Sequence, residues 1–274
     1  MSDLAPSKRW TMDDAARRIA VPAEHDDKYS RGVLGVITGS AMYPGAAVIG
    51  VESALRTGVG MVRYLGPARA SDLVLQRRPE AVTADGRVQA WLIGSGMDHA
   101  ERGDLAQIVS ALEQPVPVVL DGGALDLHDR AAGSVVITPH YRELARLLGG
   151  DVDRIAADPE GAARRAADEL GVTVLLKGHT TFIAGPGIAL SASSAPTWLA
   201  TAGSGDALAG ILGALVATHA AEIERDPAEF ARLAATAAVV HGLAAERASA
   251  GGPLTVLDLA AAIPATIADL LRSL

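Results

Sequence analysis

The chain has 274 residues, no cysteine and a formal net charge of −8 at pH 7. This length suits one large α/β domain with a sizeable core, and we expect a single domain over residues 1–274 with an N-terminal arm over residues 1–28. The negative charge argues against a nucleic-acid-binding or membrane-binding protein, since either needs a basic face, and the lack of cysteine excludes disulfides, thiolate catalysis and thiolate metal sites.

The first part of the chain shows no signal for export or membrane insertion. Residues 1–20 are charged and lack an apolar core segment, and no window reaches the roughly 18 apolar residues of a membrane helix. We therefore expect a soluble, cytoplasmic protein. The N-terminal arm is polar and contains prolines, and we expect it to form a short helix that lies over the main fold.

Strands and helices alternate over the next part of the chain. Short apolar runs predict strands at residues 33–38, 61–65, 91–93, 116–120, 135–137 and 172–176. Helices are expected at residues 46–57, 67–77, 101–113, 141–148 and 159–170. Thr138 is expected to cap the helix that follows it, with Pro139 at the first helical position.

The last part of the chain departs from this alternation. Two short β runs, 182–184 and 188–191, predict a hairpin that turns at residues 185–187. Helices are then expected over residues 205–219 and 227–248 and over 256–271, the last of them kinked or broken at Pro264. The fold class is thus α/β, with a mostly parallel central sheet and helices on both faces.

Several loops follow the carboxyl ends of predicted strands, where open α/β sheets bind their ligands. These loops are residues 39–46, 94–96, 121–124 together with His140, and 177–181. Lys177 before Gly178 suits a phosphate contact, although a solvated lysine is the commoner reason for this pair. His140 and His179 could bind substrate or hold loop backbone, and Asp121 could form a turn or bind Mg²⁺.

The most informative stretch is the glycine-rich turn at residues 201–210, which leads into an apolar helix. Gly203 and Gly205 allow positive φ, so the backbone can point its N–H groups at an anion bound at the first turn of the helix. Asp206 beside such a site suits a base that takes a proton from an attacking hydroxyl. The structural alternative is that Ser204 caps the helix and Asp206 complements its dipole.

Three common nucleotide and hydrolase motifs are missing from the sequence. There is no G-x-x-x-x-G-K-[ST] phosphate loop, and residues 58–60 lack the third glycine and the downstream acid of a dinucleotide fingerprint. No Gly-x-Ser-x-Gly elbow follows a strand with a suitable histidine after it. A Walker ATPase, a Rossmann dehydrogenase and a serine hydrolase are therefore disfavoured.

Six motifs occur in a fixed order along the chain. They are TGSAMYPGAA at 38–47, IGSG at 93–96, LDGGAL at 120–125, ITPH at 137–140, LKGHTT at 176–181 and AGSGD at 202–206. With these motifs the chain resembles, from about residue 29 to 271, the ADP/ATP-dependent NAD(P)H-hydrate dehydratases of the ribokinase-like superfamily. Thr38, Ser95 and Ser204 depart from the residues usual in that family.

The resemblance implies roles for particular residues. Positions that contact the hydrated nicotinamide dinucleotide are matched by Ala46, Gly96, His140 and Asp206. The adenine-nucleotide site is matched by Lys177, Gly178, His179, Thr180, Thr181 and Gly205, and we add Gly203 as part of the phosphate cradle. Asp206 is the expected catalytic residue. No residue is assigned to a metal, and Mg²⁺ is expected to bridge the nucleotide.

The resemblance implies a lyase that repairs damaged cofactors. It would convert the S form of NADHX or NADPHX to NADH or NADPH through a phosphorylated intermediate, releasing phosphate and either AMP from ADP or ADP from ATP. The alternatives are a ribokinase-like kinase of a vitamin-precursor alcohol and a nucleotide-binding regulatory module. Many relatives carry a fused epimerase domain, for which this chain is too short. The family favours a homo-oligomer, with a tetramer among the options.

Overall fold

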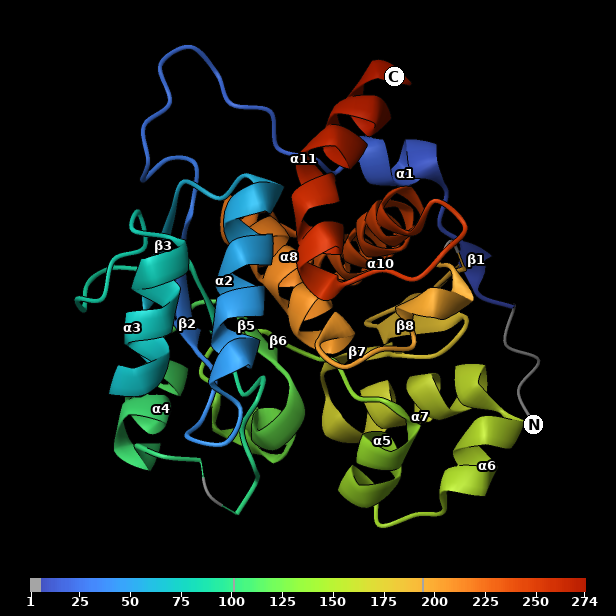
Figure 1. Cartoon of the computed structure of the whole chain (residues 1–274). Helices are drawn as coiled ribbons and strands as arrows, with labels where there is room; N and C mark the ends of the chain where they lie inside the picture. Colours follow the sequence, from blue (N-terminus) through green and yellow to red (C-terminus); the bar gives the residue numbers. More distant parts are fainter. Residues whose placement is uncertain (1–5, 101, 194) are drawn as a thin grey trace.

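The computed structural model describes residues 6–100, 102–193 and 195–274, which build a nine-stranded sheet (Figure 1). The strands are β1 (Lys8–Arg9), β2 (Val33–Ile37), β3 (Met61–Tyr64), β4 (Ala90–Ile93), β5 (Val118–Leu120), β6 (Val135–Ile137), β7 (Thr173–Leu176), β8 (Thr181–Gly185) and β9 (Ile188–Ala192). Their order is β1-β9-β8-β7-β6-β5-β4-β2-β3. The strands from β7 to β3 run parallel, and β8 is antiparallel to both neighbours. The expected mostly parallel sheet and the hairpin are confirmed.

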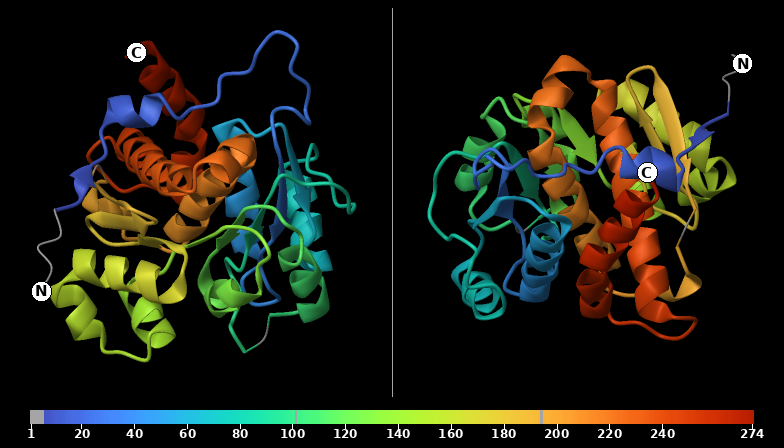
Figure 2. Two further views of the ribbon diagram at one scale, coloured as in Figure 1. Left: turned by 180° about the vertical axis from the view of Figure 1, so that it is seen from behind. Right: turned by 90° about the horizontal axis from the view of Figure 1, so that it is seen from above.

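Helices cover both faces of this sheet (Figures 1 and 2). They are α1 (Met12–Ala16), α2 (Pro44–Thr57), α3 (Ala68–Arg77), α4 (Leu105–Leu112), α5 (Tyr141–Leu147), α6 (Val152–Ala157), α7 (Pro159–Leu170), α8 (Ser204–Thr218), α9 (Ala220–Arg225), α10 (Ala228–Ser249) and α11 (Val256–Arg272). Helices α2, α8, α10 and α11 pack on one face, and α4, α5 and α7 pack on the other. Within the described residues, none of the helices has both the length and the apolar character to cross a membrane.

Successive residues of the central strands point into two different cores. In β4, Leu92 belongs to the core under α2, α8 and α10, whereas Trp91 and Ile93 belong to the core under α4 and α7. Gly35 in the neighbouring strand makes room for the indole, because a Cβ at residue 35 would lie 2.4 Å from the Trp91 ring. Since both faces are buried, the strands are continuous apolar runs, which is why the sequence reveals them so clearly.

Helices α2 and α8 touch through two glycines. A Cβ added to Gly210 of α8 would lie 2.3 Å from the carbonyl oxygen of Gly50 in α2. A Cβ on Gly50 would in turn lie 3.7 Å from the carbonyl oxygen of Asp206. This close contact holds the first turn of α8, with Asp206, against α2.

We expect Gly210→Ala to lower the free energy of unfolding by about 1–3 kcal/mol, because a methyl group between two touching backbones forces them apart. Denaturant unfolding followed by circular dichroism measures this loss. The control is Gly45→Ala in α2, where an added Cβ meets no atom within 4 Å. An equal loss of stability in both variants would contradict the importance of the contact.

The N-terminal arm contributes a strand that the sequence does not predict. Strand β1 pairs with β9 at the edge of the sheet, and α1 packs against α10 and α11, which confirms the expected short helix over the main fold. Between them, the buried Trp10 indole donates a hydrogen bond to the Thr236 hydroxyl at 3.1 Å. Residues 1–5 of the predicted arm lie outside the described residues.

Other element boundaries also differ from the prediction. The helix expected over residues 101–113 begins only at Leu105, since the Asp104 carboxylate accepts a hydrogen bond from the Gln107 N–H at 3.1 Å and caps the first turn; residue 101 lies outside the described residues. Residues 122–130 form a 3₁₀ helix, although a loop was expected over residues 121–124, and α6 and α9 are additions to the predicted set. Helix α11 continues through Pro264 and is not broken there.

Candidate active site

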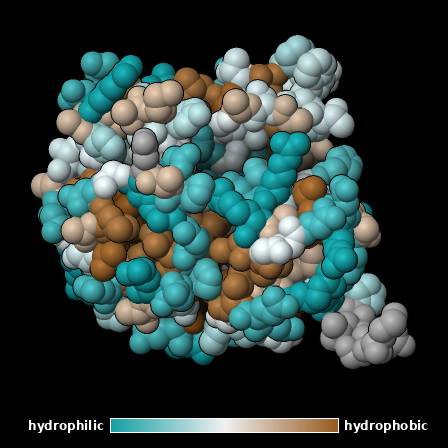
Figure 3. Space-filling view, turned by 90° about the horizontal axis from the view of Figure 1, so that it is seen from below, coloured by the Kyte–Doolittle hydropathy of each residue, from teal (hydrophilic) through white to brown (hydrophobic). Residues whose placement is uncertain are grey.

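The loops after β2, β4, β5, β6 and β7 meet at one edge of the sheet, because these five strands are neighbours and run parallel. The start of α8 joins them there. Figure 3 looks onto this side of the molecule and shows apolar side chains gathered across its middle, with hydrophilic ones around them. The structure thus brings the four predicted loops together.

A largely buried ion pair links two of these loops. Lys177 Nζ donates a hydrogen bond to Asp121 Oδ1 at 2.9 Å, and the Thr138 hydroxyl donates to the same oxygen at 2.7 Å. The Ser95 hydroxyl donates to Asp121 Oδ2 at 2.9 Å. Burial alone would raise the pKa of Asp121, but the Lys177 charge and these hydrogen bonds hold it below its ordinary value. Asp121 is therefore an anion that fixes the position of the lysine.

Thr138 does not cap the helix that follows it, contrary to the prediction. Its hydroxyl binds the buried Asp121 carboxylate, and α5 is capped by His140 instead. His140 Nδ1 accepts a hydrogen bond from the Glu143 N–H at 3.0 Å, and the Glu143 carboxylate accepts one from the His140 N–H at 2.8 Å. Pro139 consequently lies before the cap. A buried carboxylate without donors would be destabilising, so Thr138 is more useful there than at an exposed helix end.

Asp206 lies in the first turn of α8. Gly203 is the cap of this helix and has a φ of +88°, which glycine adopts without strain. Ser204 is the first helical residue, so the alternative in which Ser204 is the cap is wrong. Burial and the charge of Asp121 raise the pKa of Asp206 to about 7, and Lys177 lowers it in part. A carboxyl group with this pKa can take up a proton near neutral pH.

The Lys177 ammonium faces the start of α8. A Cβ on Gly205 would lie 3.4 Å from Lys177 Nζ, so glycine keeps this approach open. Burial lowers the pKa of Lys177, but the charges of Asp121 and Glu143 more than compensate and raise it, which keeps the lysine protonated. The first N–H groups of a helix have no partner within the helix and carry a partial positive charge. Together with the ammonium they form a site for an anion such as a phosphoryl group.

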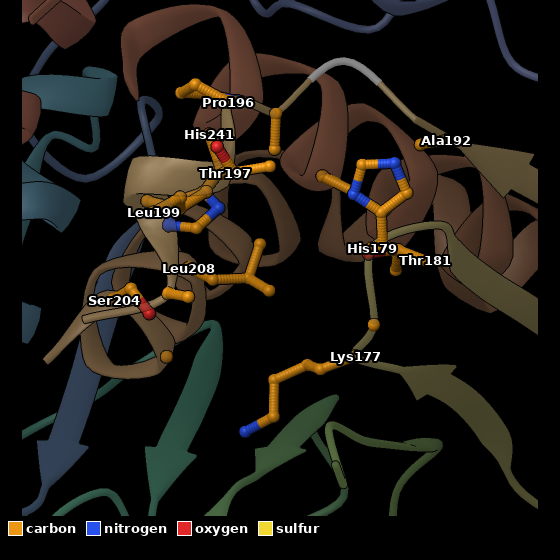
Figure 4. A pocket seen from close by; sticks show the side chains of 15 residues that line it. Lys177, His179, Thr181, Ala192, Pro196, Thr197, Leu199, Ser204, Leu208 and His241 are labelled. Carbon is orange, nitrogen blue, oxygen red and sulfur yellow. The ribbon is translucent and has the colours of Figure 1, made fainter. Parts of the chain in front are cut away.

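A pocket of about 360 Å³ extends from this anion site (Figure 4). The pocket is lined by five residues that the resemblance assigns to the nucleotide, namely Lys177, Gly178, His179, Thr181 and Gly205. Thr180 and Gly203 adjoin these residues in the chain but do not line the pocket. The opposite wall is mostly apolar and comes from residues 195–197, 199 and 200 and from α8 and α10.

The residues matched to the hydrated dinucleotide lie in two places. Ala46 and Gly96 are in contact, since a Cβ on Gly96, whose φ is +67°, would lie 2.4 Å from the Ala46 Cβ. A second pocket, of about 620 Å³ and lined in part by residues 39–43, lies beside them. His140 lies further along the edge, where its backbone pairs with that of Lys177. The backbone of Asp206 lies against Gly50 of α2, and its charge acts on Lys177.

The described residues contain no group of three histidine, cysteine or acidic side chains that could hold a metal ion. Both carboxylate oxygens of Asp121 accept hydrogen bonds from protein donors. Asp206 is a nearby carboxylate that could serve a cation. Mg²⁺ commonly binds phosphate oxygens, waters and one or two carboxylates, so these residues fit an ion that arrives with the nucleotide.

Two residues of the site do not emerge from the sequence motifs. Ser95 stands out there only as a departure from the family pattern, yet its hydroxyl holds Asp121. His241 of α10 lines the nucleotide pocket and is buried. A single histidine within an apolar helical stretch is the signal that could have drawn attention to it, because buried polar side chains need a partner.

Relatives in sequence point to one family. The family model described as NAD(P)H-hydrate dehydratase matches residues 34–265. The chain is 46% identical over 221 residues to the bifunctional NAD(P)H-hydrate repair enzyme Nnr of Mycobacterium tuberculosis. The aligned residues cover 75% of this chain and 45% of that protein. The chain therefore spans about half the length of that relative. It is 35% identical over 244 residues to the ADP-dependent (S)-NAD(P)H-hydrate dehydratase of Neisseria meningitidis, covering 82% of this chain and 79% of that one.

A solved structure agrees with these relatives. The ADP/ATP-dependent NAD(P)H-hydrate dehydratase from Bacillus subtilis, co-crystallized with ATP/Mg²⁺, superposes with a TM-score of 0.86 at 25% identity, covering 96% of this chain and 99% of that chain. The expected ribokinase-like fold is thereby confirmed. Because the family model covers most of the chain and the fold agrees over nearly its whole length, this chain belongs to the NAD(P)H-hydrate dehydratase family.

Proposed function

We propose that this chain dehydrates the S forms of the NADH and NADPH hydrates, NADHX and NADPHX, and uses ADP or ATP to do so. The observation that supports the proposal is Asp206, a carboxyl group with a pKa of about 7 in the first turn of α8, close enough to Lys177 for the two charges to affect each other. The names of the Mycobacterium and Neisseria relatives supply the substrate class.

The two pockets suit the two substrates. The pocket at Lys177 would take the adenine nucleotide, with its phosphates between the ammonium and the first turn of α8, where Gly203 and Gly205 form the cradle. Residues 178–181 would form its other side. The hydrate would lie toward Ala46 and Gly96, with His140 at the same edge. In this arrangement the hydrate's hydroxyl would lie next to the terminal phosphoryl group, with Asp206 beside the hydroxyl.

The reaction then follows from the chemistry of the hydrate, whose hydroxyl is on the carbon next to the ring nitrogen. Asp206 accepts the hydroxyl proton as the oxygen attacks the terminal phosphorus and the bond to the departing AMP or ADP breaks. Lys177 and the N–H groups of α8 stabilise the negative charge on the transferred group. The ring nitrogen supplies the electron pair that expels phosphate. Loss of a proton from the neighbouring ring carbon restores the double bond of NAD(P)H.

Several finer points belong to the same proposal. Mg²⁺ bound to the nucleotide phosphates, with Asp206 in reach, would neutralise charge on the transferred group. The resemblance also implies a homo-oligomer and a cytoplasmic location, which stay predictions. The choice between ADP and ATP, and between NADHX and NADPHX, is left to experiment.

We expect incubation with S-NADHX, Mg²⁺ and ADP to regenerate NADH together with equal amounts of inorganic phosphate and AMP. The absorbance of reduced nicotinamide measures NADH, and ³¹P nuclear magnetic resonance measures phosphate and AMP in the same sample. A parallel sample with ATP ranks the nucleotides. An organic phosphate that accumulates without recovery of NADH would favour the kinase alternative. No consumption of either nucleotide would favour the regulatory module.

A further inference from the structure

His241 of α10 lies in the wall of the nucleotide pocket with one ring nitrogen unused. The residue is 7% exposed, lines the pocket, and has no hydrogen-bond partner for Nε2 among the described residues. Figure 4 shows its ring and that of His179 on opposite sides of the pocket, with the Lys177 side chain below them. An unpaired buried polar atom destabilises a fold by about 1–3 kcal/mol. The position of this nitrogen is therefore better explained by a ligand than by the fold.

The protonation state of the ring follows from its surroundings. Burial lowers the pKa of His241 to about 4, and the Lys177 charge acts in the same direction, while a hydrogen bond with the Ser204 backbone acts against both. With a pKa of about 4 the ring is neutral near pH 7, so one of its nitrogens carries a proton and the other is an acceptor. The unpaired Nε2 can therefore pair with a group that both donates and accepts, such as a hydroxyl.

We propose that His241 Nε2 accepts a hydrogen bond from a ribose hydroxyl of the adenine nucleotide, an inference that rests on the function proposed above. A hydroxyl suits Nε2 in either tautomer of the ring, whereas a phosphate oxygen can only accept. Ser204, which binds the ring, is next to Gly205 of the phosphate cradle. The ligand group beside His241 is therefore the one that follows the phosphates, which is the sugar. The apolar remainder of the pocket, with Leu199 and Leu208, suits the base.

This contact makes the sugar a determinant of specificity. A site with a buried acceptor rejects a ligand that lacks the matching hydroxyl, because the acceptor then stays desolvated and unpaired. His241 would thus select ribonucleotides over deoxyribonucleotides without touching the reacting atoms.

The test measures affinity and not turnover. Isothermal titration calorimetry of the whole chain gives Kd for ADP, 2′-deoxy-ADP and 3′-deoxy-ADP. We expect the wild type to bind one of the deoxy nucleotides about tenfold more weakly than ADP, the effect of one lost hydrogen bond to a buried group. In His241→Phe, which fills the space of the ring but has no acceptor, this ratio should fall to about one. His241→Asn, which retains an acceptor, should recover part of it.

The matched control is His179→Phe, since His179 lies across the same pocket but is exposed. That variant should keep the wild-type ratio between ADP and the deoxy nucleotides, whatever its affinity for ADP. Thermal unfolding checks that the His241→Phe variant is folded. His241→Leu takes its place if the phenylalanine variant does not fold.

The outcomes separate the two proposals. A wild type that binds neither ADP nor ATP contradicts the proposed function. A wild type that binds ADP and both deoxy nucleotides equally well contradicts the role of His241 alone. Retention of the tenfold ratio in His241→Phe or His241→Leu contradicts it as well.

Discussion

Asp206→Asn is expected to lower the rate of hydrate dehydration by about 10²–10⁴-fold, the usual contribution of a positioned general base. Asparagine fills the same space but cannot take the proton of the attacking hydroxyl, so the step fails while both substrates still bind. Recovery of NADH at saturating ADP and S-NADHX measures kcat. Calorimetry with ADP should show that nucleotide binding is retained. An undiminished kcat would remove Asp206 from the mechanism.

The pH profile of the wild type tests the same role without a substitution. Asp206 must be ionised to act as a base, and its pKa is raised to about 7 by burial and by the charge of Asp121. We therefore expect kcat/KM to rise with pH up to about 7 and then to level off. The residual activity of Asp206→Asn should not show this rise of kcat/KM with pH. The same rise in the variant would mean that another group titrates.

The stability of the same variant shows what the raised pKa means for the fold. The folded pKa of about 7 exceeds the ordinary value of 3.8, so the folded state holds the Asp206 proton more tightly than the unfolded state does. The free energy of unfolding therefore falls as the pH rises from about 4 to 7, and the loss is complete above 7. The side chain introduced by Asp206→Asn carries no charge, so the variant should be more stable than the wild type at pH 8.

The size of this stabilisation follows from the shift. About three pKa units at 1.36 kcal/mol each give an upper bound of about 4 kcal/mol. At pH 4 the two proteins should unfold alike, because wild-type Asp206 is then protonated in the folded state. Denaturant unfolding at both pH values measures the difference. A variant that is less stable than the wild type at pH 8 would show that Asp206 serves the fold and not the reaction.

The fold was largely predictable because its strands are buried on both faces. A strand such as β4 appears as an uninterrupted apolar run, and glycines or prolines mark where the chain turns. Strand β1 was not predictable, since it consists of two exposed basic residues whose pairing depends on the free edge of β9. The short helices α6 and α9 are likewise too short for a helical period to emerge.

The site was predictable to the extent that it depends on strand ends. Loops after parallel strands share an edge, so Lys177 and Asp121 could be expected near each other. The pairing of individual side chains could not, because it depends on contacts between distant parts of the chain. Threonine is a residue type that often caps helices, but the Thr138 hydroxyl binds the buried Asp121 carboxylate instead. His241 is remote in sequence from every motif, and only the packing of α10 brings it to the pocket.

Lys177→Met is expected to lower the free energy of unfolding by about 3–5 kcal/mol, because it leaves the Asp121 carboxylate buried without its counter-charge. Asp121 is 4% exposed, and the remaining donors, Ser95 and Thr138, carry no charge. Denaturant unfolding near neutral pH measures the loss. The matched control is Lys8→Met, which breaks an exposed ion pair with Asp14 and should change stability by less than about 1 kcal/mol.

A double variant separates the two roles of the lysine. Lys177→Met combined with Asp121→Asn removes both charges, so most of the lost stability should return. Nucleotide affinity should not return, because the cation that faces the start of α8 is still missing. Calorimetry with ADP on the wild type, Lys177→Met and the double variant measures this directly. If the double variant bound ADP as tightly as the wild type, Lys177 would serve only to neutralise Asp121, and the phosphates would have to bind elsewhere.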